Sequence, residues 1–155
     1  MTRTILVPHE DNEASGKAIK YAIEIAKCMD MAIKLVRVVP EVVDFSTMSH
    51  WNVAERKRVK EALGLYRKEV QDQETKNLRR HISRINAEGI KASATVVEGV
   101  DAAERIAELI RQERPYMVII ASTRLKLRGL ARLRMLGSVA RKLSEQSESP
   151  VLIVK

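Results

Sequence analysis

The sequence predicts a single α/β domain in which a doubly wound, parallel, five-stranded sheet carries helices on both faces. Apolar segments typical of strands alternate along the chain with amphipathic helical patterns, and this order specifies parallel strands with right-handed crossovers. Three strand segments contain the runs ILV, MVIIA and VLIV, which are apolar at every position, as in strands buried on both faces. The chain has 155 residues, of which 45% are hydrophobic, and this size fits one domain spanning residues 1–155.

Five segments rich in Val and Ile are the predicted strands. The first helix follows Asp11 and Asn12, whose side chains can accept hydrogen bonds from free N–H groups. A second, unusually long helical pattern runs from about Asn52 to Ala87, with one apolar side and one side of mixed charge. The strands are predicted at residues 4–9, 32–39, 90–98, 116–122 and 150–155.

The third and fourth helices precede the last two strands. A capping box, Asp101 with Glu104 three residues later, opens the third helix. The fourth begins near Gly137 and Ser138. In doubly wound sheets, ligands bind beyond the C-terminal ends of the strands, at the switch point of the strand order. That edge is predicted to carry residues 8–12, residues 38–40 and the segment from Ala121 onward.

The sequence carries no signal for export or for a membrane. No apolar run approaches the length of about 18 to 20 residues that crosses a bilayer. The N-terminus lacks the charged head and long apolar region of a secretion signal. We therefore expect a cytoplasmic protein that is not integral to a membrane. The single cysteine, Cys28, has no internal disulfide partner, and we expect it to be a small buried residue.

The net charge of +8 is concentrated in one segment. Residues 114–144 hold eight basic and no acidic residues, and the rest of the chain is neutral in sum. Such a patch would attract a polyanion. However, it has no aromatic side chain after Tyr116 on which bases could stack, which disfavours nucleic acid. Leucines interleave with the basic residues, so an acidic partner helix or a membrane surface is a further alternative.

Several segments, in order along the whole chain, resemble the universal stress protein family. They are ILVPHEDNEAS at 5–15, EGVDAAERI at 98–106, MVIIAST at 117–123, GLARLRMLGSVARKL at 129–143 and SPVLIVK at 149–155. The resemblance implies a Rossmann-like fold of the adenine nucleotide alpha hydrolase-like type and a part in stress responses. As in many members of that family, it also implies ATP or another adenine nucleotide as the cofactor.

The family's nucleotide motif is only partly present. It consists of Gly, two residues, Gly, nine residues, and then Gly followed by Ser or Thr. Its last pair is intact as Gly137 and Ser138, at a helix start where free N–H groups and the helix dipole would hold a phosphate. Counting back by this spacing, the earlier glycines fall on Leu127 and Arg124. Aligned from the strand instead, the first glycine becomes Ser122, and side chains at these positions should crowd the phosphate.

Basic side chains offer another way to hold an anion. Arg124, Lys126 and Arg128 could bind a phosphate through their side chains in place of the lost glycine backbone. The resemblance implies six further pocket positions. Pro8 and Val38 would flank the adenine, Glu10 would accept from the ribose or the base where the family typically has Asp, Ala121 stands where Met is common, Ser122 ends the strand, and Val139 follows Ser138.

Catalytic and metal sites find no support in the sequence. His9, His50 and His81 are scattered, with no zinc spacing. No Ser-His-Asp pattern with a nucleophile elbow occurs. We therefore predict no catalytic residue, no metal ligand and at most slow ATP hydrolysis. His9 could line a pocket at the end of its strand, but we expect that local backbone groups satisfy its ring.

The last strand, 150–155, is predicted to lie at a sheet edge that a monomer would leave unpaired. The resemblance implies a homodimer through this strand, with Val151, Ile153 and Lys155 near the axis. Three alternatives stay open for the ligand. The chain binds an adenine nucleotide in the family manner, or another small anionic ligand, or no small ligand. In the third case it is a dimeric interaction protein whose basic loop 124–134 contacts a partner protein or polyanion.

Overall fold

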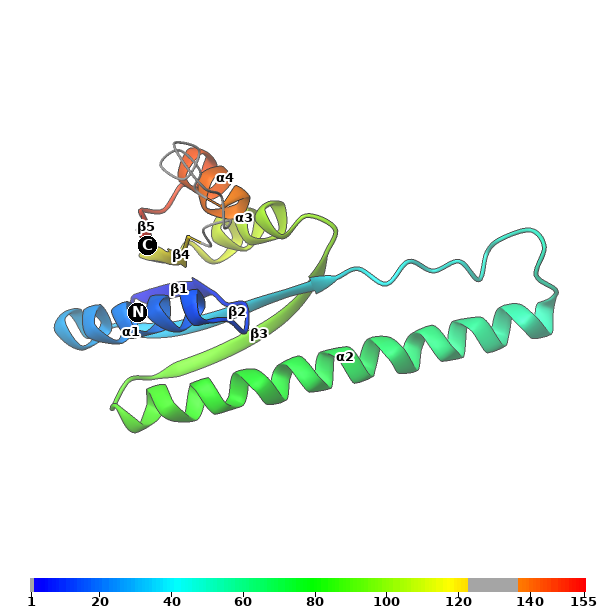
Figure 1. Cartoon of the computed structure of the whole chain (residues 1–155), viewed down its shortest axis with the longest axis horizontal. Helices are drawn as coiled ribbons and strands as arrows, with labels where there is room; N and C mark the ends of the chain where they lie inside the picture. Colours follow the sequence, from blue (N-terminus) through cyan, green and yellow to red (C-terminus); the bar gives the residue numbers. More distant parts are fainter. Residues whose placement is uncertain (1, 123–136) are drawn as a thin grey trace.

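The computed structural model describes residues 2–122 and 137–155. Within these ranges the chain forms one five-stranded sheet in the order β3-β2-β1-β4-β5, and all four neighbouring pairs are parallel (Figure 1). Helices cover both faces, which confirms the predicted fold class. The strand order reverses between β1 and β4, and this is the switch point at which ligands of such sheets bind.

The elements fall close to their predicted positions. The first half of the chain holds β1 (Thr4–Pro8), α1 (Glu13–Met29), β2 (Ala32–Pro40) and α2 (Val53–Ala87). The second half holds β3 (Ala92–Gly99), α3 (Ala102–Glu113), β4 (Met117–Ala121), α4 (Ser138–Gln146) and β5 (Val151–Val154). Each predicted strand overlaps the observed one with ends that differ by two residues or fewer, because runs of Val and Ile between turn residues mark buried strands clearly.

Two hydrophobic cores lie on opposite faces of the sheet. Successive strand residues point to opposite faces, so Ile5 and Val7 of β1 join one core while Leu6 joins the other. The first core also contains residues of α1 and α2, and the second contains residues of α3 and α4. This division makes the sheet doubly wound, and it leaves the C-terminal ends of β1 and β4 between the two helix layers.

Side chains define the starts of three helices. Asn12 accepts a hydrogen bond from the backbone N–H of Ser15 at 2.8 Å, as its position before α1 predicts. Asp101 likewise accepts from Glu104 before α3. A complete capping box is present at α2, where Asn52 accepts from the N–H of Glu55 and the Glu55 side chain accepts from the N–H of Asn52. These caps replace partners that the first N–H groups of a helix lack.

The long helix α2 extends beyond the sheet as an arm. Its N-terminal half and the preceding segment, residues 41–52, project past the end of β2 (Figure 1). Leu78 and Ile85 are its buried residues, whereas Leu65 and Tyr66 are 71% and 58% exposed. The predicted apolar side of this helix is therefore fully buried only in its C-terminal part. None of the helices in the described ranges is both long and apolar enough to cross a membrane.

The expectation that Cys28 is buried is wrong. Cys28 is exposed on α1 rather than buried. The buried stripe of this helix includes Ala18, Ala22 and Ala26. Cys28 is two residues beyond Ala26, and two residues turn a helix by roughly 200°, so it faces away from the sheet.

Candidate functional site

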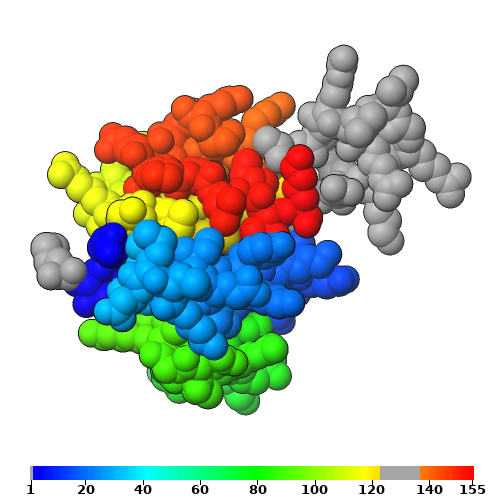
Figure 2. Space-filling model, turned by 90° about the vertical axis from the view of Figure 1, so that its left-hand side faces the viewer, coloured from blue at the N-terminus to red at the C-terminus, as the bar shows by residue number. Residues whose placement is uncertain are grey.

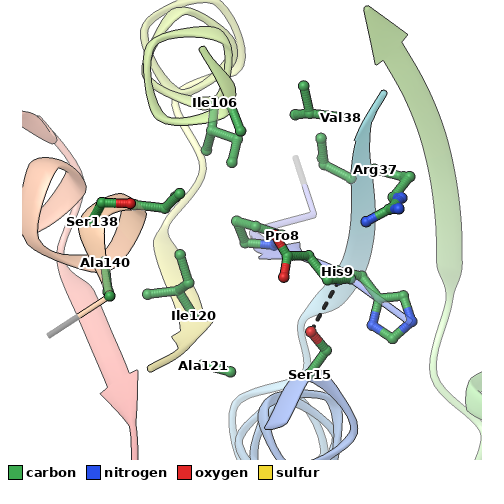
Figure 3. A pocket seen from close by; sticks show the side chains of 15 residues that line it. Pro8, His9, Ser15, Arg37, Val38, Ile106, Ile120, Ala121, Ser138 and Ala140 are labelled. Carbon is green, nitrogen blue, oxygen red and sulfur yellow. Dashed lines mark hydrogen bonds between the residues drawn. The ribbon is translucent and has the colours of Figure 1, made fainter. Parts of the chain in front are cut away.

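A cavity lies at the switch point of the sheet. The ends of β1, β2 and β4 and the first turns of α3 and α4 enclose it (Figure 3). Seven of the predicted site residues line it: Pro8, Glu10, Val38, Ala121, Gly137, Ser138 and Val139. The fold thus brings together positions that are far apart in the sequence.

Of the other four predicted residues, the structure describes Ser122. Ser122 is buried at the end of β4, where its N–H donates to the carbonyl of Val154 at 2.8 Å. It adjoins the cavity without being one of its lining residues. Arg124, Lys126 and Arg128 lie outside the described residues, as do Leu127, the other position counted back for a glycine, and the basic loop 124–134.

The start of α4 forms one end of the cavity. Gly137 is the N-cap residue and makes no side-chain cap, and the first turn holds no acidic residue. The other three helices each have a side-chain cap and an acidic residue in the first turn. The N–H groups of Ser138, Val139 and Ala140 have no partner within the helix itself. This end of the cavity is therefore positively polarised and suited to an anion.

Apolar side chains form the walls between β1, β2 and α3. Pro8, Val38, Ile106 and Ile120 surround the middle of the cavity (Figure 3). The close packing of β3 on α3 holds this wall in place, since a Cβ added to Gly99 would meet Arg105 Cβ at 3.0 Å. A flat aromatic base is a group that such a lining can enclose.

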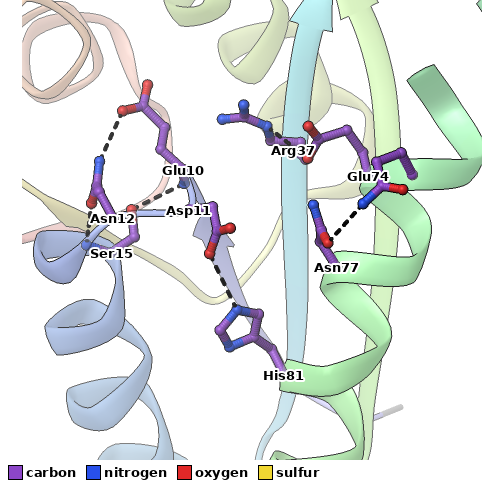
Figure 4. A network of polar contacts seen from close by, with 9 residues as sticks. Glu10, Asp11, Asn12, Ser15, Arg37, Glu74, Asn77 and His81 are labelled. Atoms are coloured by element: carbon purple, nitrogen blue, oxygen red, sulfur yellow. Dashed lines mark hydrogen bonds and ion pairs between the residues drawn. The ribbon is translucent and has the colours of Figure 1, made fainter.

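The loop between β1 and α1 is held by its own polar side chains. The backbone N–H of Glu10 donates to Ser15 Oγ at 3.0 Å, and Asn12 Nδ2 donates to Glu10 Oε2 at 3.2 Å (Figure 4). Ser15 is buried, whereas Glu10 is exposed at the cavity edge. The Glu10 carboxylate accepts one hydrogen bond from Asn12 and retains free acceptor positions for a ligand.

His9 differs from its prediction. Its side chain is 5% exposed and lines the cavity, but neither ring nitrogen has a hydrogen-bond partner within the described residues. The expectation that local backbone groups satisfy the ring is therefore wrong. Burial is the main reason that the pKa of His9 is lowered from 6.5 to about 4, and His81 lowers it further. His9 is thus a neutral imidazole at physiological pH.

Helix α2 brings two further residues to this region. His81 packs edge-on against His9, with ring centroids 4.5 Å apart, and its Nε2 lies 4.0 Å from Asp11 Oδ1 (Figure 4). Glu74 accepts from Nε of Arg37, a cavity-lining residue of β2, at 3.2 Å. These contacts join residues far apart in the chain, and no local pattern of the sequence indicates them.

The sequence and the fold are similar to those of universal stress proteins. The profile of the universal stress protein family matches residues 1–155. Universal stress protein MJ0531 of Methanocaldococcus jannaschii is 26% identical over 156 residues, a span of 99% of this chain and 82% of that protein. Among solved structures, the hypothetical protein MJ0577 superposes with a TM-score of 0.73 at 20% identity, covering 100% of this chain and 96% of its own.

Two other solved structures contain nucleotides. The universal stress protein of Archaeoglobus fulgidus in complex with dAMP has a TM-score of 0.58 at 14% identity, covering 100% of this chain and 98% of its own. A universal stress protein in complex with cAMP has a TM-score of 0.65 at 19% identity, covering 99% and 97%. At these identities the structures establish the fold, and the match to the family profile over the whole chain establishes the family. This chain belongs to the universal stress protein family.

Proposed function

We propose that this protein is a stress-response module that binds an adenine nucleotide in the cavity at the switch point. Gly137, Ser138 and Val139 would hold a phosphate at the start of α4, and Pro8 and Val38 would pack on the base. Glu10 would accept a hydrogen bond from the ribose or the base. The complexes of two family members with dAMP and cAMP support this choice of ligand.

The start of α4 carries the proposal. This is the one helix of the described residues whose first turn has neither a side-chain cap nor an acidic residue. Its free N–H groups face a cavity that is apolar in its middle. A phosphate joined to an aromatic base satisfies both features, because the anion pairs with the helix dipole and the base replaces water at the walls.

Calorimetric titration of the purified protein with ATP, AMP and cyclic AMP tests this function. The matched variant is Ser138→Glu. Ser138 is exposed, so the new carboxylate should fold without strain and favour the helix dipole. The same carboxylate would occupy the phosphate position and repel the phosphate of a nucleotide. We expect Ser138→Glu to weaken nucleotide binding at least tenfold while the protein stays folded.

Ser144→Glu is the control on the same helix. Ser144 is exposed about 1.7 turns further along α4, and its hydroxyl donates to the carbonyl of Arg141. The Ser144→Glu variant should bind nucleotide as tightly as the parent protein does. If the parent protein binds none of the three nucleotides, or if Ser138→Glu binds as tightly as the parent, the proposed function is wrong. The alternative, an interaction protein without a small ligand, would then take its place.

We also propose a homodimer through β5 and a cytoplasmic location. β5 ends the strand order, so its outer edge has no neighbour among the described strands. The C-terminal strand lies at the surface between α4 and α1 (Figure 2). Exposed strand edges pair readily with another copy. Along β5, alternate residues direct their backbone hydrogen-bonding groups toward β4. The backbone groups of Val151 and Ile153 point to the outer edge, where they would pair with the partner strand.

A further inference from the structure

We propose that His9, Asp11 and His81 form a binding site for one divalent transition-metal ion such as Zn²⁺. The ligands would be one ring nitrogen of each histidine and one carboxylate oxygen of Asp11. The ligand atoms of these residues all lie within 4.8 Å of one another. The site joins the residue that follows β1, the loop after it and the last third of α2, and Figure 4 shows Asp11 and His81 facing each other.

The state of His9 is the first support. Its side chain is 95% buried, yet both ring nitrogens lack a partner among the described residues. Buried polar groups in folded proteins are almost always paired, and an unpaired one calls for an explanation. A metal ion at one of these nitrogens would accept the lone pair that nothing else takes. The neutral imidazole is also the form that binds metals.

Distances give the second support. His81 Nε2 and Asp11 Oδ1 are 4.0 Å apart, and the rings of His9 and His81 have centroids 4.5 Å apart. Ligand atoms around tetrahedral zinc lie roughly 3.3 Å apart, as its bond lengths of about 2.0 to 2.1 Å require. To hold an ion, the ligand atoms therefore need to approach one another by up to about 1.5 Å, from within 4.8 Å to roughly 3.3 Å.

The two outer ligands are able to make this adjustment. The side chain of Asp11 is 62% exposed and that of His81 is 28% exposed, so each can change rotamer without disturbing the core. His9 is fixed by its burial, and its backbone N–H donates to the carbonyl of Val36 at 2.8 Å. One rigid and two adjustable ligands would thus close around the ion.

The ligand types select the class of metal. Two imidazoles with one carboxylate suit Zn²⁺, Co²⁺, Ni²⁺ or Cu²⁺, whereas Mg²⁺ and Ca²⁺ prefer oxygen ligands. Arg37 is the nearby positive charge that would oppose a cation, and its Nε is paired with Glu74 at 3.2 Å. Three protein ligands leave a fourth position for water, as in zinc sites with an open position.

Zinc titration of the full, untagged chain tests the proposal. The Cys28→Ser background removes an exposed thiol that could bind zinc elsewhere. After treatment with chelator and its removal, calorimetry with ZnCl₂ should give one ion per chain, and MgCl₂ should give no binding. His81→Ala and Asp11→Asn should each weaken zinc binding at least tenfold. Co²⁺ should show visible bands of low-symmetry coordination that disappear in His81→Ala.

Matched controls keep the result decisive. His50→Ala and Asp72→Asn change the same residue types outside the cluster, and both should bind zinc as the parent does. Far-UV circular dichroism in chelator shows whether each variant is folded. The proposal is overturned if the parent binds no zinc, if folded His81→Ala binds it equally well, or if His50→Ala loses as much. No nucleotide is present, so these outcomes are independent of the nucleotide proposal.

Discussion

Lys142 on α4 donates a hydrogen bond to Asp101, the N-cap residue of α3, with 2.8 Å between Nζ and Oδ2. The other oxygen, Oδ1, accepts from the backbone N–H of Glu104 at 3.1 Å. One carboxylate therefore caps α3 and also contacts α4, whose first turn lines the cavity. The hydrogen bond from Lys142 is the main cause that lowers the pKa of Asp101 below its ordinary value of 3.8.

Substitution of Asp101 should separate these two roles. Asp101→Asn keeps a cap acceptor and loses the ion pair, whereas Asp101→Ala loses both. We expect the thermal unfolding midpoint at pH 7 to fall slightly in Asp101→Asn, because exposed ion pairs contribute little, and further in Asp101→Ala. The parent's advantage is present above pH 3.8 and is lost as the pH falls through the lower folded-state pKa. Equal midpoints for the two variants would contradict the capping role.

The buried ring of His9 should make the metal-free fold sensitive to acid. The pKa of His9 is lowered from 6.5 to about 4 in the folded protein. Burial is the largest cause and His81 the next, Asp11 raises this pKa, and Arg37 lowers it. Between pH 6.5 and 4 the unfolded chain binds a proton that the folded protein does not. Stability is therefore full above pH 6.5 and falls as the pH decreases toward 4.

Urea denaturation of chelator-treated protein between pH 7.5 and 4 measures this effect. His9→Phe keeps an aromatic ring and removes the titration, so its stability should depend less on pH in that window than the parent's. His50→Gln changes a histidine outside the cluster and should keep the parent's dependence. If His9→Phe shows the same pH dependence as the parent, a group other than His9 causes the loss of stability in this pH range.

Gly99 and Gly16 should respond to alanine in opposite directions. A Cβ on Gly99 would lie 3.0 Å from Arg105 Cβ and 3.5 Å from Val38 Cγ1, whereas nothing lies within 4 Å of one on Gly16. Gly99→Ala should destabilise by about 1 kcal/mol or more through overpacking. Gly16→Ala, inside α1, should stabilise by about 0.5 to 1 kcal/mol. Urea denaturation gives both values, and a stabilised Gly99→Ala would show that α3 moves aside freely.

Proline at Ile153 should dissociate the proposed dimer without breaking the sheet. The carbonyl of Pro150 accepts from Val118 of β4, and that of Val154 accepts from Ser122, which follows β4. Because backbone groups of alternate residues bond the neighbouring strand, the N–H of Ile153 points toward the free edge. Ile153→Pro removes that outer donor. We expect light scattering after gel filtration to show a monomer, while Ile153→Ala, which keeps the N–H, stays dimeric. A dimer in Ile153→Pro would place the interface elsewhere.

Local sequence patterns predict the sheet and the positions along its ligand edge. Pro8, Val38 and Ala121 stand at the ends of apolar runs, and parallel strands bring such ends to one edge. The start of α4 is recognisable from Gly137 and Ser138. The alternation of elements predicts parallel strands, whose C-terminal ends lie at one edge of the sheet, and the strand order that brings these residues together comes from the structure.

Other features depend on contacts that no local pattern encodes. His9 and His81 meet because α2 packs against β3 and β2 and so brings His81 to the residue that follows β1. The spacing of two distant histidines in the sequence gives no sign of this contact. The apolar periodicity of α2 likewise predicts a face without telling which turns the sheet covers. Sequence reasoning therefore locates the cavity, but it misses the partners that α2 brings.

The N-terminal half of α2, which projects beyond the sheet, should unfold locally more readily than its C-terminal part. α2 has 35 residues, so it is about 52 Å long at 1.5 Å per residue, and its buried residues Leu78 and Ile85 both lie in the last third. Amide protons near Ile85 can exchange with solvent only when the core separates, whereas those near Val53 need only the capped end to fray. The first turns of α2 can therefore unwind while the sheet and its cavity keep their shape.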